Sequence, residues 1–287
     1  MKSAKLAEKG IVIGYDTRFA SEDFAAAAAG VMAGNSIKCY LSPKTIPTPE
    51  VSFGVTVKKA GAGVVITSSH NPAIYNGFKI KSADGASAPA EMINAVEENI
   101  EKIFQSPQIK SLPLETALKE NLVEYFDFDD LYLQRMSEFV DIQRIKKSGF
   151  KIVFDAMFGA GSGYLTRLLG GGNISVIEIN GERNPAFPGI NPEPIKQNLE
   201  CLAETVMEAG ADVGLAMDGD ADRIGIIDEN GRFITQLEVY ALLALYLLEV
   251  KKQRGPIVKT VTATNMLYRL GELYLSLIHI SEPTRPY

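Results

Sequence analysis

The sequence predicts an α/β fold: two consecutive α/β/α three-layer domains with mixed, mostly parallel sheets, followed by the start of a third domain. The chain has 287 residues, close to two domains of about 150 residues each. Short apolar runs typical of buried strands alternate with helical patterns along the chain. This order is typical of strands joined by crossover helices, which makes neighbouring strands parallel. A break at residues 254–256 (RGP) precedes one more strand, which begins the third unit.

The first domain is predicted to span residues 1–145. Strands are expected at 11–15, 37–41, 63–67 and 76–80, and helices at 21–32, 50–60, 89–104 and 129–145. Ser21 is the expected N-cap of the first helix, because its hydroxyl can accept a hydrogen bond from a free N–H of the first turn. These elements predict one mostly parallel sheet with helices packed on it.

The second domain is predicted to span residues 146–255, and the third to begin at 256–275. The second domain is expected to contain strands at 151–155, 176–179 and 213–217, a hairpin of 224–228 with 233–234, and helices at 195–209 and 237–252. A strand at 257–262 opens the third domain, and its apolar side at 257–261 is expected to be unpaired and to promote aggregation. Residues 276–287 are similar to a translated sequencing-adapter read, and we expect them to be a non-native tail.

Charge and composition exclude several functional classes. Thirty-five acidic and 29 basic residues give a net charge of −6, so we expect no binding to nucleic acid or to an anionic membrane. The N-terminal residues lack the apolar core of a secretory signal, and the longest apolar run, 239–248, is shorter than the roughly 20 residues that span a bilayer. Two isolated thiols, Cys39 and Cys201, fit a reducing compartment. We therefore expect a cytoplasmic protein with no obligate protein partner.

Three carboxylates at alternate positions directly follow a predicted strand. Asp218, Asp220 and Asp222 can converge on one divalent cation if their backbone forms a loop, and ligands bind at strand ends in open α/β sheets. A solvated acidic turn is one alternative. A calcium helix-loop-helix site is another, because these residues and Glu229 occupy its first, third, fifth and twelfth positions. Arg223 at the sixth position, where glycine is required, and the β-like flanks disfavour the calcium site.

Residues 67–72 (TSSHNP) also follow a predicted buried strand. Their hydroxyl, imidazole and amide groups could present a nucleophile next to backbone N–H groups that hold an anion. A plain polar loop is the alternative, because Ser, Asn and Pro are common turn residues. Taken alone, this segment favours the plain loop.

A glycine-rich segment at residues 158–164 (FGAGSGY) partly matches a dinucleotide-binding fingerprint. The match is incomplete because Tyr164 stands where Gly or Ala is needed. A glycine-rich start of a packed helix explains the segment better.

Taken together, these segments resemble the α-D-phosphohexomutase family, whose best-known members are phosphoglucomutase and phosphomannomutase. The resemblance rests on residues 67–72 (TSSHNP), 76–79 (NGFK) and 218–223 (DGDADR), in this order and spacing. Residues 14–18 (GYDTR) and 191–194 (NPEP) support it. Two independent motifs roughly 150 positions apart are hard to obtain by chance.

The resemblance implies an enzyme that moves a phosphoryl group between positions 6 and 1 of a hexose phosphate. Ser69, matching the family's catalytic serine, would carry the phosphoryl group and, with Asp218, Asp220 and Asp222, would hold Mg²⁺. A phosphoserine carries about −1.5 to −2 charges at neutral pH, which a divalent cation and basic side chains must offset. Ser69 would pass its phosphoryl group to the substrate, giving a hexose 1,6-bisphosphate. This intermediate and activator then returns its other phosphate to Ser69.

Five further side chains receive roles from the resemblance. Lys79 would be the general acid or base for the sugar hydroxyl, which requires its pKa to be lowered; otherwise it is a solvated strand residue. Arg223 would contact the transferring phosphate, with a salt bridge to a neighbouring Asp as the alternative. Arg18 would face the phosphoserine or the substrate phosphate, with a surface ion pair as the alternative. His70 and Asn71 would contact phosphate or hydroxyl groups.

The sequence also departs from the family pattern. Complete members have four domains, with a sugar-selecting loop in the third and a phosphate clamp in the fourth, and neither is found here. The usual Gly-rich opening is missing before Lys5. We therefore expect a fragment truncated at the C-terminus and at the N-terminus, whose own mutase activity is lost or greatly reduced. The alternative function is an inactive metal- and phosphate-binding fragment. The preferred hexose stays open.

Overall fold

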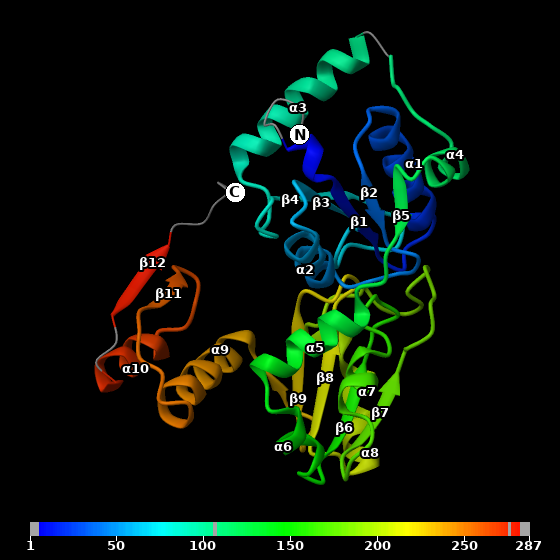
Figure 1. Ribbon diagram of the computed structural model, residues 1–287. Helices are drawn as coiled ribbons and strands as arrows, with labels where there is room; N and C mark the ends of the chain where they lie inside the picture. Colours follow the sequence, from blue (N-terminus) through cyan, green and yellow to red (C-terminus); the bar gives the residue numbers. More distant parts are fainter. Residues whose placement is uncertain (1–5, 106–107, 275–276, 282–287) are drawn as a thin grey trace. The chain divides into compact units, whose positions relative to one another are not determined.

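The computed structural model describes residues 6–105, 108–274 and 277–281. The chain divides into two compact units, Met1–Gly231 and Arg232–Tyr287 (Figure 1). Within the described ranges, the strands of the first unit form two sheets, each with mostly parallel neighbours and one antiparallel pair. The predicted α/β fold with consecutive α/β/α layers and mixed sheets is confirmed. The domain limits at residues 145 and 255 stay predictions.

The first sheet has the strand order β4-β3-β1-β2-β5. Its strands are β1 (Ile11–Tyr15), β2 (Cys39–Leu41), β3 (Ala62–Ile66), β4 (Phe78–Lys81) and β5 (Val123–Tyr125). The helices of this part are η1 (Ala7–Lys9), α1 (Ser21–Gly34), α2 (Thr48–Lys58), α3 (Ala90–Gln105) and α4 (Leu114–Lys119). Only the β3–β4 pair is antiparallel among the pairings of these strands. The carboxyl ends of β1, β2 and β3 therefore lie at one edge of the sheet.

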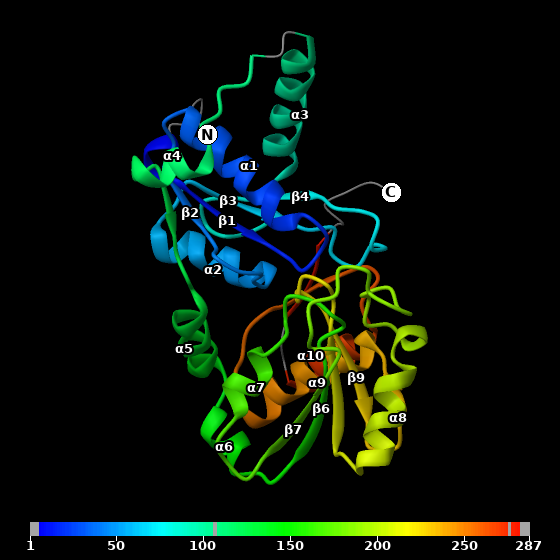
Figure 2. The ribbon, with the colours of Figure 1, turned by 90° about the vertical axis from the view of Figure 1, so that its right-hand side faces the viewer.

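Helices on both faces explain why β1 is apolar at every position. Ile11 and Ile13 pack with α1 on one face, whereas Val12 packs with α2 on the other (Figure 2). Side chains of a strand alternate between faces, so a strand covered on both sides must be continuously apolar. The expected strand at 11–15 matches β1 at both ends.

The second sheet contains β9 (Ile224–Asp228), β8 (Val213–Met217), β6 (Lys151–Asp155) and β7 (Ser175–Ile179), in that spatial order. The associated helices are α5 (Asp129–Phe139), α6 (Ile142–Lys146), α7 (Tyr164–Leu169), η2 (Lys196–Asn198) and α8 (Glu200–Ala209). Gly214 of β8 faces Leu202 and Val206 of α8, while Ile152 of β6 packs with α6 and α7 on the other side. The glycine-rich segment at 158–164 leads into α7, as expected for the start of a packed helix.

Local details differ from the expected elements. The helix expected at 129–145 is two helices, because Val140 is extended and Asp141 begins a new helix by accepting a hydrogen bond from Arg144 N. The elements that were not predicted include α4 and β5. Ser21 is not the N-cap of α1: its hydroxyl donates to Asp16 Oδ1 at 3.0 Å, and the N-cap is the preceding residue, Ala20, whose backbone is left-handed (φ +56°).

The second unit contains β10 (Phe233–Ile234), α9 (Gln236–Leu245), a π-helical turn η3 (Tyr246–Val250), β11 (Ile257–Thr260), α10 (Met266–Tyr274) and β12 (Ile278–Ser281). Strand β11 pairs in parallel with β12. The expectation of an unpaired strand is therefore wrong for 257–260, because part of the expected tail completes a two-stranded sheet. Residues 276 and 282–287 of that tail lie outside the described residues. Within the described ranges, no helix is long and apolar enough to cross a bilayer.

Candidate active site

Ser69 lies in the loop that follows β3, here called the serine loop (residues 67–72). Thr67 Oγ1 accepts a hydrogen bond from Ser69 N at 2.8 Å and donates to Asp16 Oδ2 at 2.6 Å. Ser69 has φ +54°, a left-handed conformation that is uncommon for a residue other than glycine. Its side chain is buried. Backbone strain of this kind is concentrated at functional sites.

Arg18, which follows β1, holds the backbone of the serine loop. Its Nε donates to Asp16 Oδ2 at 3.1 Å, and the guanidinium is fully buried. The Nη atoms donate to four backbone carbonyls at 2.6–2.9 Å: those of Ser69, Asn71 and Pro72 in the serine loop and that of Tyr75 just after it. These five bonds use all five N–H donors of the guanidinium. The expectation that Arg18 faces a phosphate is therefore corrected: in this structure it positions the backbone of the serine loop.

The three aspartates lie in the loop that follows β8, here called the aspartate loop (residues 218–223). Asp218 Oδ1 accepts hydrogen bonds from the backbone N–H groups of Asp222 and Arg223, both at 2.9 Å. The loop thus folds back around the first carboxylate. Gly219 is required here, because an added Cβ would lie 2.6 Å from the carbonyl oxygen of Ser69. The two loops approach each other at backbone level.

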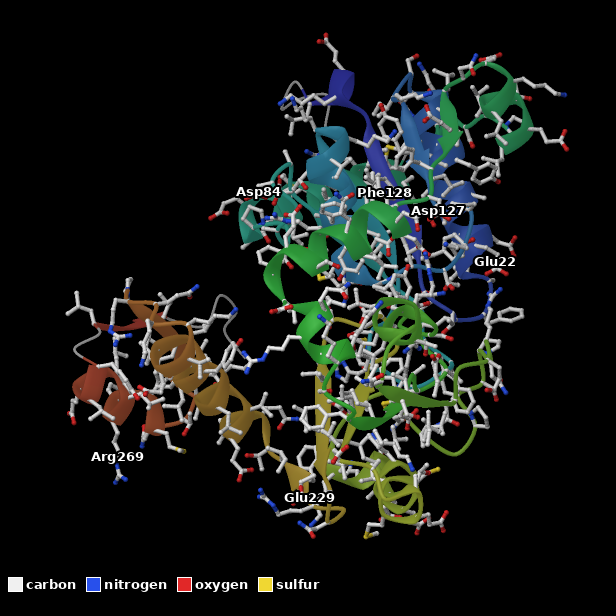
Figure 3. All side chains as sticks on the ribbon, turned by 60° about the horizontal axis from the view of Figure 1, so that its bottom comes forward. Glu22, Asp84, Asp127, Phe128, Glu229 and Arg269 are labelled. Carbon is white, nitrogen blue, oxygen red and sulfur yellow. The ribbon has the colours of Figure 1, made fainter. Side chains whose placement is uncertain are left out.

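The serine loop and the aspartate loop meet in one site. Ser69 Oγ donates a hydrogen bond to Asp218 Oδ2 at 3.0 Å, across 149 positions of the chain. Asp218, Asp220 and Asp222 each offer a carboxylate oxygen within 4.8 Å of the others. The antiparallel β8–β9 pairing puts Glu229 at the opposite end of this sheet, where Figure 3 labels it. The calcium-site alternative therefore lacks its twelfth ligand.

The charges of the aspartate loop fit a divalent cation. Asp218 and Asp220 are fully buried. Burial, together with repulsion from Asp220 and Asp222, raises the pKa of Asp218. Asp220 Oδ1 is buried and has no hydrogen-bond partner among the described residues. An unpartnered carboxylate oxygen inside an acidic cluster is costly unless a cation binds it, and carboxylate oxygens suit Mg²⁺.

Lys79 of β4 and Thr48 of α2 connect the first sheet to the aspartate loop. Lys79 Nζ lies 2.6 Å from Asp220 Oδ2 and 3.3 Å from Asp222 Oδ2. Thr48 Oγ1 donates to Asp220 Oδ2 at 2.5 Å, and Thr48 N donates to the Asp220 carbonyl at 2.8 Å. Burial disfavours the charged form of Lys79, but the two carboxylates outweigh it and raise its pKa. The lowered pKa expected for an acid–base lysine is therefore not found in this state.

The remaining expected residues lie around the two loops. Arg223 Nη1 is 3.3 Å from Glu193 Oε1, so its salt bridge is to a glutamate instead of a neighbouring aspartate. His70 Nε2 is 3.8 Å from the same oxygen, and His70 Nδ1 is buried without a partner in the described part of the chain. Asn71 Nδ2 donates to Ser68 Oγ at 3.0 Å. Arg223, His70 and Asn71 thus border the site.

Three contributors to the site were not predicted from the sequence: Asp16, Thr48 and Glu193. Asp16 and Glu193 fall within two segments that support the family resemblance, residues 14–18 and 191–194, so these motifs were a usable signal. Thr48 had no comparable signal, because a threonine at the start of a helix is ordinarily explained as part of the helix terminus.

Two family models match most of the first unit. Residues 1–107 match the family described as phosphoglucomutase/phosphomannomutase, alpha/beta/alpha domain I, and residues 130–231 match domain II of the same family. The chain belongs to the phosphoglucomutase/phosphomannomutase family. These matches cover more than half of the chain and include both loops of the site.

Individual relatives support the family and carry several substrate names. The chain is 36% identical over 256 residues to a protein of Methanothermobacter thermautotrophicus named as probable phosphoglucosamine mutase, covering 88% of this chain and 53% of that one. It is 35% identical over 262 residues to the phosphoglucomutase/phosphomannomutase of Thermococcus kodakarensis, covering 90% and 54%. The crystal structure of a candidate phosphomannomutase from Thermus thermophilus superposes with a TM-score of 0.85 at 32% identity, covering 97% of this chain and 64% of that one. The chain spans about half the length of these curated relatives.

Proposed function

We propose that this chain carries the phosphoryl-transfer groups of a phosphohexomutase that interconverts hexose 6-phosphate and hexose 1-phosphate. The reaction would pass through a phosphoserine at Ser69 and a hexose 1,6-bisphosphate. The hydrogen bond of 3.0 Å between Ser69 Oγ and Asp218 Oδ2 carries the proposal. It supports a site in which the hydroxyl that receives the phosphoryl group lies against a cluster of carboxylates suited to a divalent cation.

The residues of both loops divide the chemistry of transfer. Asp218, Asp220, Asp222 and the Ser69 oxygen would hold Mg²⁺. When bound, Mg²⁺ neutralises charge on the phosphoryl oxygens. Asp218 accepts the Ser69 hydroxyl proton in a hydrogen bond and so orients Oγ. The strained φ of Ser69 keeps that oxygen aimed at the aspartate loop.

The basic and polar groups around the loops would contact the phosphate and the sugar. Arg223 is 45% exposed at its side chain and is held by Glu193, so it can turn toward a phosphate with little loss of surface ion pairing. His70 Nδ1 is a buried nitrogen that a ligand hydroxyl or phosphate oxygen could satisfy. Asn71 offers its amide from the same loop. Lys79 is a protonated ammonium in this state, which suits it to donate a proton to a sugar oxygen.

The parts of the chain take separate roles in this proposal. Residues 1–145 would form domain I with the serine loop, residues 146–255 domain II with the aspartate loop, and residues 256–275 the start of domain III. The substrate would be a hexose monophosphate, and the relatives' names extend the candidates to glucose, mannose and glucosamine phosphates. Two free thiols, Cys39 and Cys201, favour a cytoplasmic setting.

Phosphoryl uptake tests the proposal without requiring full turnover. The chain would be incubated with Mg²⁺ and glucose 1,6-bisphosphate, and intact mass would count the phosphoryl groups gained. We expect one group on the wild type and on Ser68→Ala, the matched control, and none on Ser69→Ala. Equal uptake by the wild type and Ser69→Ala would remove Ser69 from its role.

A coupled mutase assay with each hexose 1-phosphate then decides between the two functions. Turnover that depends on Ser69 supports a mutase, and uptake without turnover supports the metal- and phosphate-binding alternative. Because the chain spans about half the length of its curated relatives, we expect turnover of these 287 residues alone to be lost or greatly reduced.

A further inference from the structure

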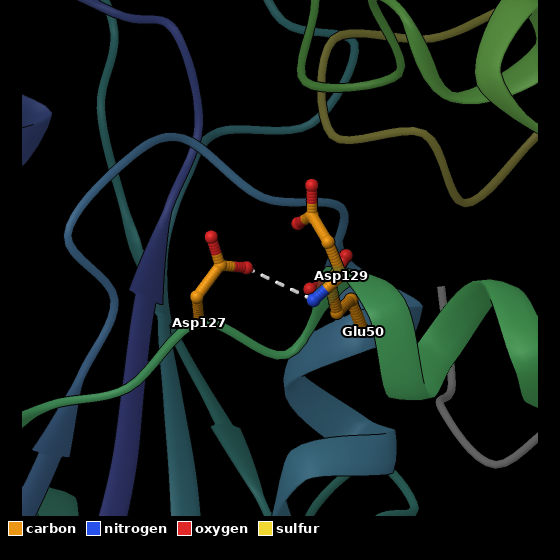
Figure 4. Close-up of side chains that lie close together, drawn as sticks. All are labelled: Glu50, Asp127 and Asp129. Atoms are coloured by element: carbon orange, nitrogen blue, oxygen red, sulfur yellow. Dashed lines mark hydrogen bonds between the residues drawn. The ribbon is translucent and has the colours of Figure 1, made fainter.

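Helix α2 makes a second contact with the second sheet's helices, away from the aspartate loop. Glu50, in the first turn of α2, is fully buried. Tyr164 Oη of α7 lies 2.5 Å from Glu50 Oε2 and 2.8 Å from Asp129 Oδ1 of α5. Figure 4 shows Glu50 and Asp129 close together at the start of α5. Two carboxyl groups therefore share one tyrosine hydroxyl.

Counting protons assigns one of these carboxyls a hydrogen. Two hydrogen bonds link Tyr164 Oη to carboxyl oxygens, and each needs one proton between its two oxygens. Burial raises the pKa of Tyr164, so the hydroxyl keeps its own proton. That proton serves one bond only. The second bond requires that Glu50 or Asp129 is a neutral acid.

The surrounding charges place the extra proton on Glu50. Asp129 Oδ2 accepts from Lys44 Nζ at 2.6 Å and from Arg167 Nη1, and these cations keep it ionised. Although burial favours the neutral form of Asp129, Lys44 and Arg167 outweigh it and lower its pKa. Glu50 Oε1, by contrast, is buried with no hydrogen-bond partner among the residues described. Burial raises the pKa of Glu50 to about 8.

The ionisable groups around Glu50 include Asp129 and Tyr132 of α5 and Lys44. Burial is the largest influence on the pKa of Glu50 and raises it; Asp129 raises it further, whereas the hydrogen bond with Tyr164 and the charge of Lys44 lower it by less. Asp127 precedes α5 and is 2.9 Å from Lys44, which itself precedes α2. Glu50, Asp127 and Asp129 are close enough to hold a metal ion. The ammonium of Lys44 and the guanidinium from α7 already neutralise the two aspartates, so this cluster needs no metal.

We propose that Glu50 is a positioning residue for the aspartate loop. As a neutral acid it donates a hydrogen bond to Tyr164 Oη, and the Tyr164 hydroxyl in turn donates a hydrogen bond to Asp129. This chain of bonds fixes the first turn of α2. Thr48, two residues earlier on the same turn, holds Asp220 through its hydroxyl and its backbone N–H. Losing the proton of Glu50 leaves two ionised carboxylates against one hydroxyl, which loosens α2 and the Asp220 contact. The role at the metal site rests on the proposed function, whereas the location of the proton does not.

Stability as a function of pH tests where the proton lies. The free energy of unfolding of the wild type is compared with that of Glu50→Gln, whose amide N–H can donate to Tyr164 Oη without titrating. Native Glu50 binds its proton up to about pH 8 and an ordinary glutamate up to 4.5, so the native state binds more protons between these values. The contribution of Glu50 to the free energy of unfolding is therefore fully present below pH 4.5 and is lost as the pH rises to about 8.

The expected result is a wild-type unfolding constant that rises about tenfold per pH unit relative to Glu50→Gln within that window. Curves that stay parallel across the window would overturn the assignment. Carboxyl ¹³C NMR is an independent measurement: a glutamate signal that titrates near pH 8 and is missing in Glu50→Gln supports the proposal, and its absence contradicts it.

Magnesium affinity tests the positioning role. Calorimetry with MgCl₂ at pH 6 and pH 9 compares the two proteins, so that titration of the aspartates themselves affects both equally. We expect equal affinity at pH 6 and a several-fold weaker wild type at pH 9. The same pH dependence of Mg²⁺ affinity in both proteins would show that Glu50 does not position the aspartate loop. Absence of Mg²⁺ binding in both would overturn the proposed function and the positioning role, while the NMR titration still decides where the proton lies.

Discussion

Replacing Arg18 by methionine removes the group that ties the serine loop to the sheet. The guanidinium is fully buried and makes one bond to Asp16 and four to loop carbonyls. Methionine fills much of the same volume but offers no donor. Asp16 would keep hydrogen bonds from Thr67, from Ser21 and from a backbone N–H. Its charge, however, would have no cation beside it.

The magnitude follows from the buried ion pair. Removing one partner of a buried pair costs roughly 3–5 kcal/mol, because the other charge stays buried and uncompensated. Each carbonyl left without a donor would add roughly 1–3 kcal/mol. The serine loop can move and hydrate its carbonyls, so we do not add these costs. We expect Arg18→Met to lower the free energy of unfolding by about 3–5 kcal/mol.

Urea unfolding followed by circular dichroism measures this loss, with Arg135→Met as the matched control. Arg135 pairs with Glu138 on the exposed surface of α5, and its loss should cost less than about 1 kcal/mol. Hydrogen exchange should also rise in the serine loop of Arg18→Met and stay unchanged there in the control. Equal stability of the two variants, with a protected serine loop in both, would refute the positioning role of Arg18.

Three further predictions concern the site and its surroundings. Gly219→Ala should abolish phosphoryl uptake measured by intact mass, because the new Cβ would press on the Ser69 carbonyl from 2.6 Å; uptake at the wild-type level would contradict the close approach. Lys79→Met should tighten Mg²⁺ binding in calorimetry, because the ammonium no longer competes for the aspartates; weaker binding would show that the lysine supports the cation site. In the native protein a thiol reagent should modify the exposed Cys201 and spare Cys39, whose pKa burial raises to about 12; rapid modification of both would contradict the packed first sheet.

The strands and the two loops could be predicted because local sequence determines them. Covered on both faces, β1 must be apolar throughout, and its sequence shows this directly. The serine loop and the aspartate loop each follow such a run, at the sheet edge where ligands bind. By contrast, β5 has three residues, and its place in the sheet depends on pairing with β2. A strand that short carries little periodicity of its own.

The partners of buried charges could not be predicted, because they depend on where the distant backbone lies. The family motif predicts that Arg18 faces a phosphate. In the structure, its Nη atoms instead donate hydrogen bonds to backbone carbonyls more than 50 positions away. From its sequence context, Glu50 is an ordinary acidic residue in the first turn of a helix. Its burial depends on Tyr164, 114 positions later. The Asp141 cap that divides α5 from α6 was readable from the sequence and was missed.

The central claim is that Ser69 and three aspartates from a distant loop surround one divalent ion. A crystal of the chain soaked in MnCl₂, with anomalous data collected at the manganese edge, tests it directly because Mn²⁺ accepts the same oxygen ligands as Mg²⁺. We predict one strong anomalous peak within bonding distance of a carboxylate oxygen from each of Asp218, Asp220 and Asp222, with Ser69 Oγ beside it. An ion bound elsewhere, or an aspartate loop without a peak at saturating MnCl₂, would contradict the claim.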